Sequence, residues 1–184
     1  MKRGLIITLG IVVLILFGIF SVYNGLVGLN EDVNSKWSQV ENQLQRRADL
    51  IPNLVATVKG YAAQEQTIFT AVAEARSKLL SAEGPRDLAQ ANGELTSALG
   101  RLLAISESYP QLKSDANFRQ LQDELAGTEN RIANARKDYN DAVQVFNTRI
   151  KRFPTNIISG VLGFEAKEYF QADEGVQNVP EVQF

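Results

Sequence analysis

The sequence predicts an all-α protein, with an N-terminal transmembrane helix followed by an up-and-down bundle of three long helices and a short fourth. Three observations support this fold class. The chain opens on an uncharged apolar run, the apolar residues beyond it recur every 3.5 residues, and no segment alternates with the period of a strand. We therefore divide the chain into a cytoplasmic stub with its anchor (1–23), a long-helix bundle (24–154), and a short apolar helix with an extended C-terminal tail (155–184).

The anchor is the run "GLIITLGIVVLILFGIFSV", Gly4 to Val22, which contains no charge. As a helix it would span about 28 Å, close to the roughly 30 Å of a bilayer's hydrocarbon core. A cleaved signal peptide is the alternative, because a basic start and an apolar core suit both. The run is longer than a usual signal core, and no cleavage site of A-x-A type follows it. We therefore expect residues 4–22 to stay in the lipid bilayer.

The charges beside the run predict its orientation. Lys2 and Arg3 precede it, whereas the nearest cation after it is Lys36, which Glu31 and Asp32 precede. Positive charges stay preferentially on the cytoplasmic side. We expect a single-pass protein of the bacterial inner membrane with its bundle on the extracytoplasmic side.

The first bundle helix is predicted to run from Asn24 to Ser81, where "SAEGPRD" supplies a Gly-Pro break. Steps of four and three residues mark a seam that would pack on other helices. The apolar and aromatic members of this seam are Leu26, Val33, Trp37, Val40, Leu44, Ile51, Leu54, Val58, Tyr61, Ile68, Val72, Ala75 and Leu79.

Two further long helices and a short one are predicted after that break. The predicted seam of the second helix is Leu88, Ala91, Leu95, Ala98, Leu102 and Ile105, and that of the third is Phe118, Leu121, Leu125, Thr128, Ile132, Ala135, Tyr139, Ala142 and Phe146. Pro85 and Asp87 suit the first turn of the second helix, and a third runs from near Ser114 to Phe153, where Pro154 stops it. The apolar segment "TNIISGVLGFEAKEYF" supplies the fourth helix. In an up-down-up order, the third helix would carry this segment to the end of the bundle far from the membrane.

The block "RRADLIPNLV" places a proline inside the first bundle helix. Asp49 could be the N-cap of a new helix with Pro52 in its first turn. Alternatively one helix continues through a kink, which costs roughly 3 kcal/mol and requires compensation from packing. Ile51 is pushed away from helical geometry because it precedes a proline, so we favour the kinked continuous helix.

Two seam positions are charged, Arg47 and Glu65. Arg47 would either pair with a carboxylate on a neighbouring helix or extend past the rim of the core. Glu65 is the predicted second half of such a pair. With Asp49 these residues form the predicted structural polar network, which would fix the register of the helices.

The composition excludes several functional classes. The chain has no cysteine and no histidine, so thiolate nucleophiles, Ser-His-Asp triads and Cys/His metal sites cannot be built from it. Its 19 basic and 21 acidic residues leave no basic footprint for nucleic acid. We expect a protein that is not an enzyme and has no cofactor, no metal and no nucleic-acid partner.

A family resemblance covers nearly the whole chain. The anchor, the segments "RRADLIPNLV" and "ENRIANARKDYNDAVQVFNTRIKRFPTNIISGVLGF", and the terminal "VPEVQF" together resemble the LemA family of bacterial membrane proteins. The resemblance implies a helical extramembrane domain of up-and-down type. It brings no active site to transfer.

We expect a membrane-anchored scaffold or adaptor of the bacterial envelope that self-associates, forming a homo-oligomer, or binds other membrane proteins. A membrane-remodelling or stress-response polymer is the alternative, and a carboxylate-based hydrolase or small-ligand receptor is a third. The C-terminal apolar segment would either fold back as a fourth helix that closes the core or form an interface. The candidate interface residues are Ile157, Ile158, Val161, Leu162, Phe164 and Phe184.

Overall fold

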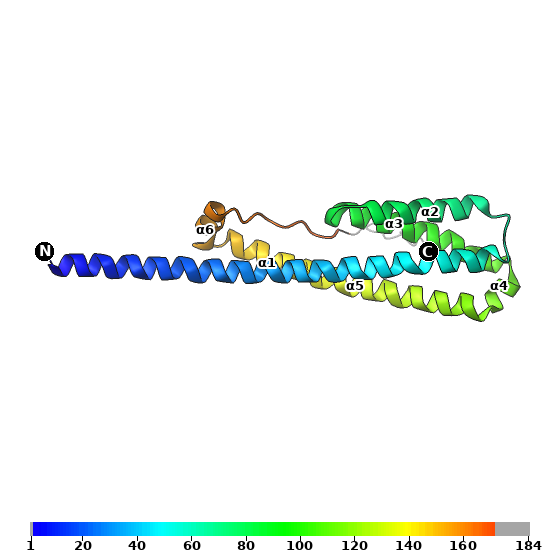
Figure 1. Ribbon diagram of the computed structural model, residues 1–184, viewed down its shortest axis with the longest axis horizontal. Helices are drawn as coiled ribbons and strands as arrows, with labels where there is room; N and C mark the ends of the chain where they lie inside the picture. Colours follow the sequence, from blue (N-terminus) through cyan, green and yellow to red (C-terminus); the bar gives the residue numbers. More distant parts are fainter. Residues whose placement is uncertain (1, 172–184) are drawn as a thin grey trace, which may run out of the picture. The chain divides into compact units, whose positions relative to one another are not determined.

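The computed structural model describes residues 2–171, and within that range every regular element is a helix (Figure 1). The elements are α1 (Lys2–Lys59), α2 (Gln66–Ser81), α3 (Gly84–Ala104), the 3-10 turn η1 (Ile105–Glu107), α4 (Pro110–Ser114), α5 (Ala116–Lys151) and α6 (Thr155–Leu162). The predicted all-α class, with a long apolar N-terminal helix, packed helices and a short C-terminal helix, is confirmed.

The chain forms two compact units, which α1 and α5 both enter. Within the described residues, unit 1 comprises 2–37 and 138–168, and unit 2 comprises 38–137 and 169–171.

Unit 2 is an up-and-down arrangement of α1, α2, α3 and α5. Within it, α2 returns along α1, since Leu79 reaches Leu44 whereas Phe69 lies under Lys59. Helix α3 then runs parallel to α1, and α5 returns again from Asp115. The predicted seams are largely the buried faces, because positions at this spacing share one side of a helix. The buried apolar seam residues of α1 to α3 in this unit are Val40, Leu44, Ile51, Leu54, Val58, Val72, Ala75, Leu79, Leu88, Ala91, Leu95, Ala98 and Leu102.

The first bundle helix ends earlier than predicted. It stops at Lys59, and the chain reverses over 60–65 before α2 begins at Gln66. Gly60 is a poor helix former, and Tyr61, the next seam position, is 39% exposed, so little buried apolar surface holds a helix together there. The continuous helix predicted to Ser81 is therefore wrong.

In unit 1, α5 runs antiparallel to α1. The rings of Trp37 and Tyr139 pack at a tilt with their centroids 5.1 Å apart. Further along α5, the Phe146 ring lies 6.3 Å from that of Phe164, which itself lies 6.2 Å from Tyr23. Phe164, just after α6, thus lies beside the part of α1 that follows its apolar run, and the predicted position of this segment at the opposite end of the bundle is wrong. The extra reversal at 60–65 makes α5 a returning helix.

Side-chain bonds to the backbone hold the segment after α6 in unit 1. Tyr139 donates its hydroxyl to the carbonyl of Glu168 at 2.8 Å. Asn147 binds Lys167 twice, donating to its carbonyl at 2.9 Å and accepting from its N–H at 2.8 Å. These bonds satisfy an extended backbone that has no helix or sheet of its own.

Candidate functional site

The charged cluster of unit 2 is built around Arg47, which is 5% exposed. Its guanidinium donates to the Asn92 side-chain oxygen at 2.8 Å, and its Nη1 lies 2.6 Å from Oε2 of Glu129. Burial lowers the pKa of Arg47, an effect that the Glu129 carboxylate opposes. Three helices, α1, α3 and α5, thus meet at one buried cation.

Pro52 lies one helical turn beyond this cluster, and α1 continues through it, as predicted. Because proline has no N–H, the carbonyl of Ala48, four residues earlier, loses its helical donor. Arg76 of α2 donates its Nε to that carbonyl at 2.8 Å. The guanidinium of a neighbouring helix therefore supplies the compensation that an uninterrupted helix requires at this position.

The predicted roles of Asp49 and Glu65 are wrong. Asp49 lies inside α1, where it accepts a hydrogen bond from Gln45 on the exposed side, so it caps no helix. Glu65 precedes α2 and accepts a bond from the Tyr109 hydroxyl at 3.4 Å, away from Arg47. The helix break at Gly60 separates Glu65 from the seam on which the pairing was predicted.

Sequence reasoning missed Asn92, Glu129 and Arg76. Glu129 looks like any carboxylate of a solvated helix face, and 44% of its side chain is in fact exposed. The need for a donor to the Ala48 carbonyl could have been expected from Pro52 alone, because an interior proline leaves one carbonyl without its helical partner. No signal in the sequence indicates which arginine supplies it.

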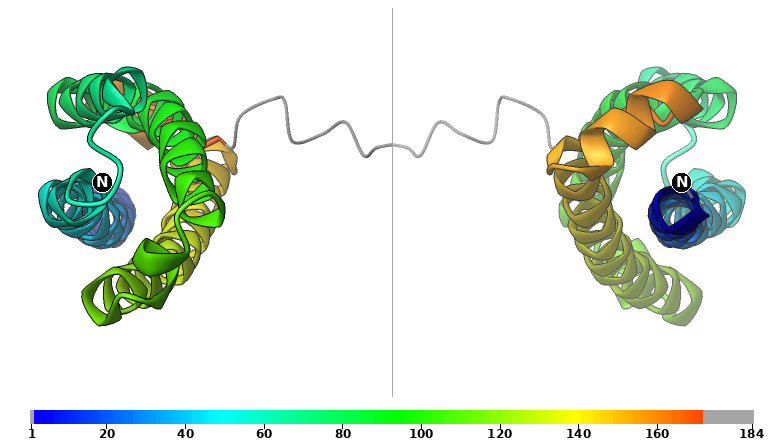
Figure 2. Two further views of the ribbon diagram at one scale, coloured as in Figure 1. Left: turned by 90° about the vertical axis from the view of Figure 1, so that its right-hand side faces the viewer. Right: turned by 90° about the vertical axis from the view of Figure 1, so that its left-hand side faces the viewer.

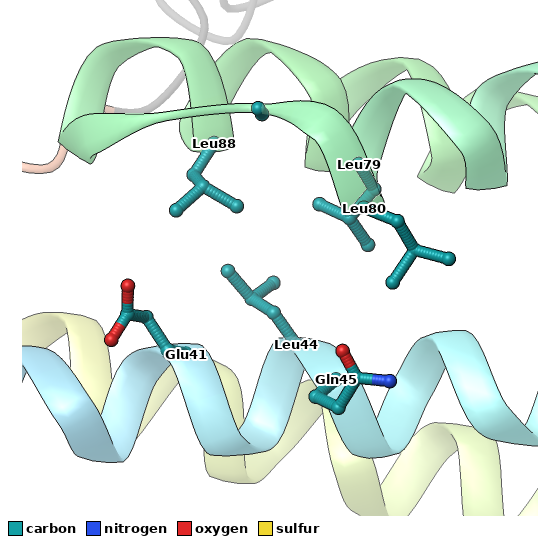
Figure 3. A pocket seen from close by; sticks show the side chains of 7 residues that line it. Glu41, Leu44, Gln45, Leu79, Leu80 and Leu88 are labelled. Atoms are coloured by element: carbon teal, nitrogen blue, oxygen red, sulfur yellow. The ribbon is translucent and has the colours of Figure 1, made fainter.

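A groove lies on unit 2 where α2 ends and α3 begins (Figure 3). Four leucines line it, and Glu41 and Gln45 of α1 add polar groups at its wall. Leu80 is 45% exposed at this position. The lining residues are Glu41, Leu44, Gln45, Leu79, Leu80, Ala82 and Leu88.

The candidate interface segment is α6 with the residue that follows its C-cap. Val161 is 82% exposed, Ile157 60% and Leu162 45%, whereas Ile158 is half-buried and Phe164 packs between aromatic rings. Phe184 lies outside the described residues. Within residues 2–171, no group of three or more acidic, histidine or cysteine side chains could hold a metal ion.

Residues 36–184 match the model of the LemA family. The chain belongs to the LemA family. "Magnetosome protein MamQ 2" of Paramagnetospirillum magneticum is 32% identical over 175 residues, which cover 81% of this chain. "Magnetosome protein MamQ" of Magnetospirillum gryphiswaldense is 30% identical over 174 residues. "Protein LemA" of Metamycoplasma hominis is 25% identical over 152 residues, covering 82% of this chain and 69% of that protein.

The alignment spans 64% of the length of the MamQ relatives and 80–81% of this chain. The LemA match includes the Arg47 cluster, Pro52 and α6, and it begins after the apolar run of α1. That run makes α1 long and apolar enough to cross a membrane, and none of its most apolar 18-residue window is buried.

Proposed function

We propose that this LemA-family chain is a non-enzymatic, membrane-anchored helical scaffold or adaptor of the bacterial cell envelope, which acts by self-association or by binding partner proteins. The continuity of α1 carries the proposal. One helix of 58 residues begins in an exposed apolar segment and ends among the buried seams of unit 2. A bilayer that covers residues 4–22 would therefore anchor the helix that contributes to both units.

The composition supports proteins and lipid as partners. With a formal net charge of −2, the chain carries no overall positive charge that would attract nucleic acid. The absence of cysteine and histidine from the sequence removes the commonest nucleophilic and metal-based routes to catalysis.

Site-specific photo-crosslinking in native membranes tests the scaffold role. A crosslinker at Leu80, which is exposed beside the leucine groove, is expected to capture a second copy or another envelope protein. The matched control is Glu74, an exposed polar position on the same helix. A chain that gives no product from Leu80 and has a monomeric protein mass in light scattering after mild detergent extraction would contradict the proposal. A large regular assembly would instead support the membrane-remodelling polymer.

Protease access tests the proposed orientation. Lys2 and Arg3 before the apolar run favour a cytoplasmic N-terminus, so protease added to intact spheroplasts should digest the bundle. Digestion only after lysis would reverse the orientation. Release of the full chain by alkaline carbonate would show that residues 4–22 are no anchor.

A further inference from the structure

Helix α6 exposes several of its apolar side chains, which is unusual for a helix in water. It buries the polar residues Thr155, at 2% exposure, and Ser159, at 4%, and it exposes Ile157 at 60% and Val161 at 82% together with the polar Asn156. The Ser159 hydroxyl donates to the carbonyl of Ile150 at 3.1 Å, which ties the polar face to the end of α5. A surface helix in water places its apolar face inward, so this reversed arrangement suits an apolar surrounding.

The end of α6 lies where α1 leaves its apolar run. Gly163 adopts the left-handed conformation with φ 74°, and the N–H of Phe164 donates back to the Ser159 carbonyl at 3.0 Å. This turn brings the Phe164 ring to 6.2 Å from Tyr23, the residue directly after Val22. Tyrosine is enriched at the membrane–water interface, and this position is the predicted edge of the bilayer.

The direction of α6 also suits that edge. In the right-hand view of Figure 2, the N-terminal part of α1 is seen end-on, whereas α6 runs across the view. If α1 crosses a bilayer, α6 lies along its surface. Interfacial helices take this direction, with their apolar face in the boundary between headgroups and acyl chains.

Two cations lie at the matching depth. Arg149 and Arg152 line a groove together with Gly25 and Leu29 of α1, which follow Val22 by about 5 and 10 Å of helix rise. A headgroup layer is roughly 5–8 Å thick, so it would reach Gly25 and end before Leu29. Neither arginine forms an ion pair with a carboxylate within residues 2–171. Guanidinium groups bind phosphate oxygens well.

We propose that α6 and the basic end of α5 form a second, peripheral contact with the bilayer that α1 crosses, at the headgroup layer of an anionic membrane. The exposed apolar side chains enter the acyl boundary, and Arg149 and Arg152 contact lipid phosphates. Continuity with the apolar run and the two arginines favour lipid over a second copy of the chain. The inference rests on the anchor in the proposed function.

Depth-dependent quenching tests the proposal on the full chain, whose lack of cysteine permits single-site labelling. Val161→Cys and the exposed anchor position Phe17→Cys carry an environment-sensitive fluorophore in vesicles of phosphatidylcholine and phosphatidylglycerol. The control is Leu80→Cys, an exposed apolar position in unit 2. We expect nitroxide lipids labelled near the glycerol to quench Val161, lipids labelled near the chain end to quench Phe17, and Leu80 to be quenched by neither.

Each of three other outcomes would overturn the inference. Quenching at Phe17 with water-like emission at Val161 overturns the second contact and leaves the anchor intact. Blue-shifted emission at Val161 that no nitroxide lipid quenches identifies a protein occupant and also overturns it. Loss of quenching at both positions removes the anchor and the inference together.

The arginines are tested by charge removal. Each cation at an anionic surface raises the equilibrium constant for membrane binding roughly fivefold. The double variant Arg149→Gln with Arg152→Gln should therefore lower the equilibrium constant for α6 docking, measured at Val161, by about 25-fold. The loss should be absent from pure phosphatidylcholine vesicles. Arg86→Gln with Arg101→Gln removes the same charge from exposed positions in unit 2. Equal losses in the two double variants would overturn the phosphate contact.

Discussion

The bond between Arg76 and the Ala48 carbonyl predicts a specific dependence on Pro52. In the native chain Arg76 is the donor that replaces the missing N–H of Pro52. Substituting Pro52→Ala restores the helical N–H four residues after Ala48. Arg76→Met should therefore destabilise the protein only while the proline is present.

The structure sets the size of this effect. Ala48 is fully buried in the native structure, where Arg76 binds its carbonyl. A hydrogen bond to a charged donor contributes about 1.5–3 kcal/mol, and Arg76 is only half-buried, so we expect a loss of about 1–2 kcal/mol. For a chain of this size, that loss lowers the melting temperature by about 3–6 °C. In the Pro52→Ala background the loss should be close to zero.

Thermal unfolding of the full chain in detergent, followed by far-ultraviolet circular dichroism, measures the four variants of this cycle. Arg86→Met is the matched control, since that arginine is exposed on α3. An equal loss from Arg76→Met with and without Pro52 would refute the reasoning, because the bond would then be independent of the proline. Such a result would assign Arg76 a packing role alone.

Three further predictions concern named side chains. Arg47→Ala should lower the free energy of unfolding in urea by about 2–3 kcal/mol, because Arg47 is buried; the loss is limited because its partner Glu129 is 44% exposed and partly hydrated. Arg46→Ala, at an exposed position, should cost much less. Equal small effects of the two variants would show that Arg47 lies at the rim of the core. Burial raises the pKa of Tyr139 to about 12, so the folded state keeps a proton that the unfolded state loses near pH 10. The contribution of the neutral Tyr139 hydroxyl to the free energy of unfolding is therefore fully present below pH 10 and should fall by about 2 kcal/mol as the pH rises toward 12. This loss should be absent from Tyr139→Phe. Hydrogen bonds from the Phe118 N–H and the Tyr61 hydroxyl lower the pKa of Asp115. The stability that these bonds add is therefore present above about pH 4 and is lost as the pH falls through the lowered pKa. If the melting temperature of Asp115→Asn drops as steeply in acid as that of the native chain, this reasoning is contradicted.

The spacing of apolar residues was enough to predict most of the core. Leu26, Val33, Val40 and Leu44 fall on the predicted seam, and each is buried. Residues spaced in this way share one face of a helix whatever that face packs against, so the prediction needs no knowledge of neighbours. The seams of α3 and α5 follow for the same reason.

The break at Gly60 could not be located in the same way. The seam pattern continues through Tyr61 to Ile68 and Val72, because α2 also buries one face. A periodic pattern does not distinguish one long helix from two that fold back on each other. A glycine costs a helix only about 1 kcal/mol, so the packing energy of the reversed arrangement decides.

By itself, the sequence determined the helical class, the apolar N-terminal run, the seams and the family resemblance, all of which depend on local composition and spacing. Tertiary structure alone decided that Arg47 pairs with Glu129 rather than Glu65, that Arg76 donates to the carbonyl freed by Pro52, and that Phe164, just after α6, lies beside Tyr23. These contacts join residues far apart in the chain. Their geometry follows from the number of chain reversals, and a single additional turn at 60–65 changes which ends of the helices meet.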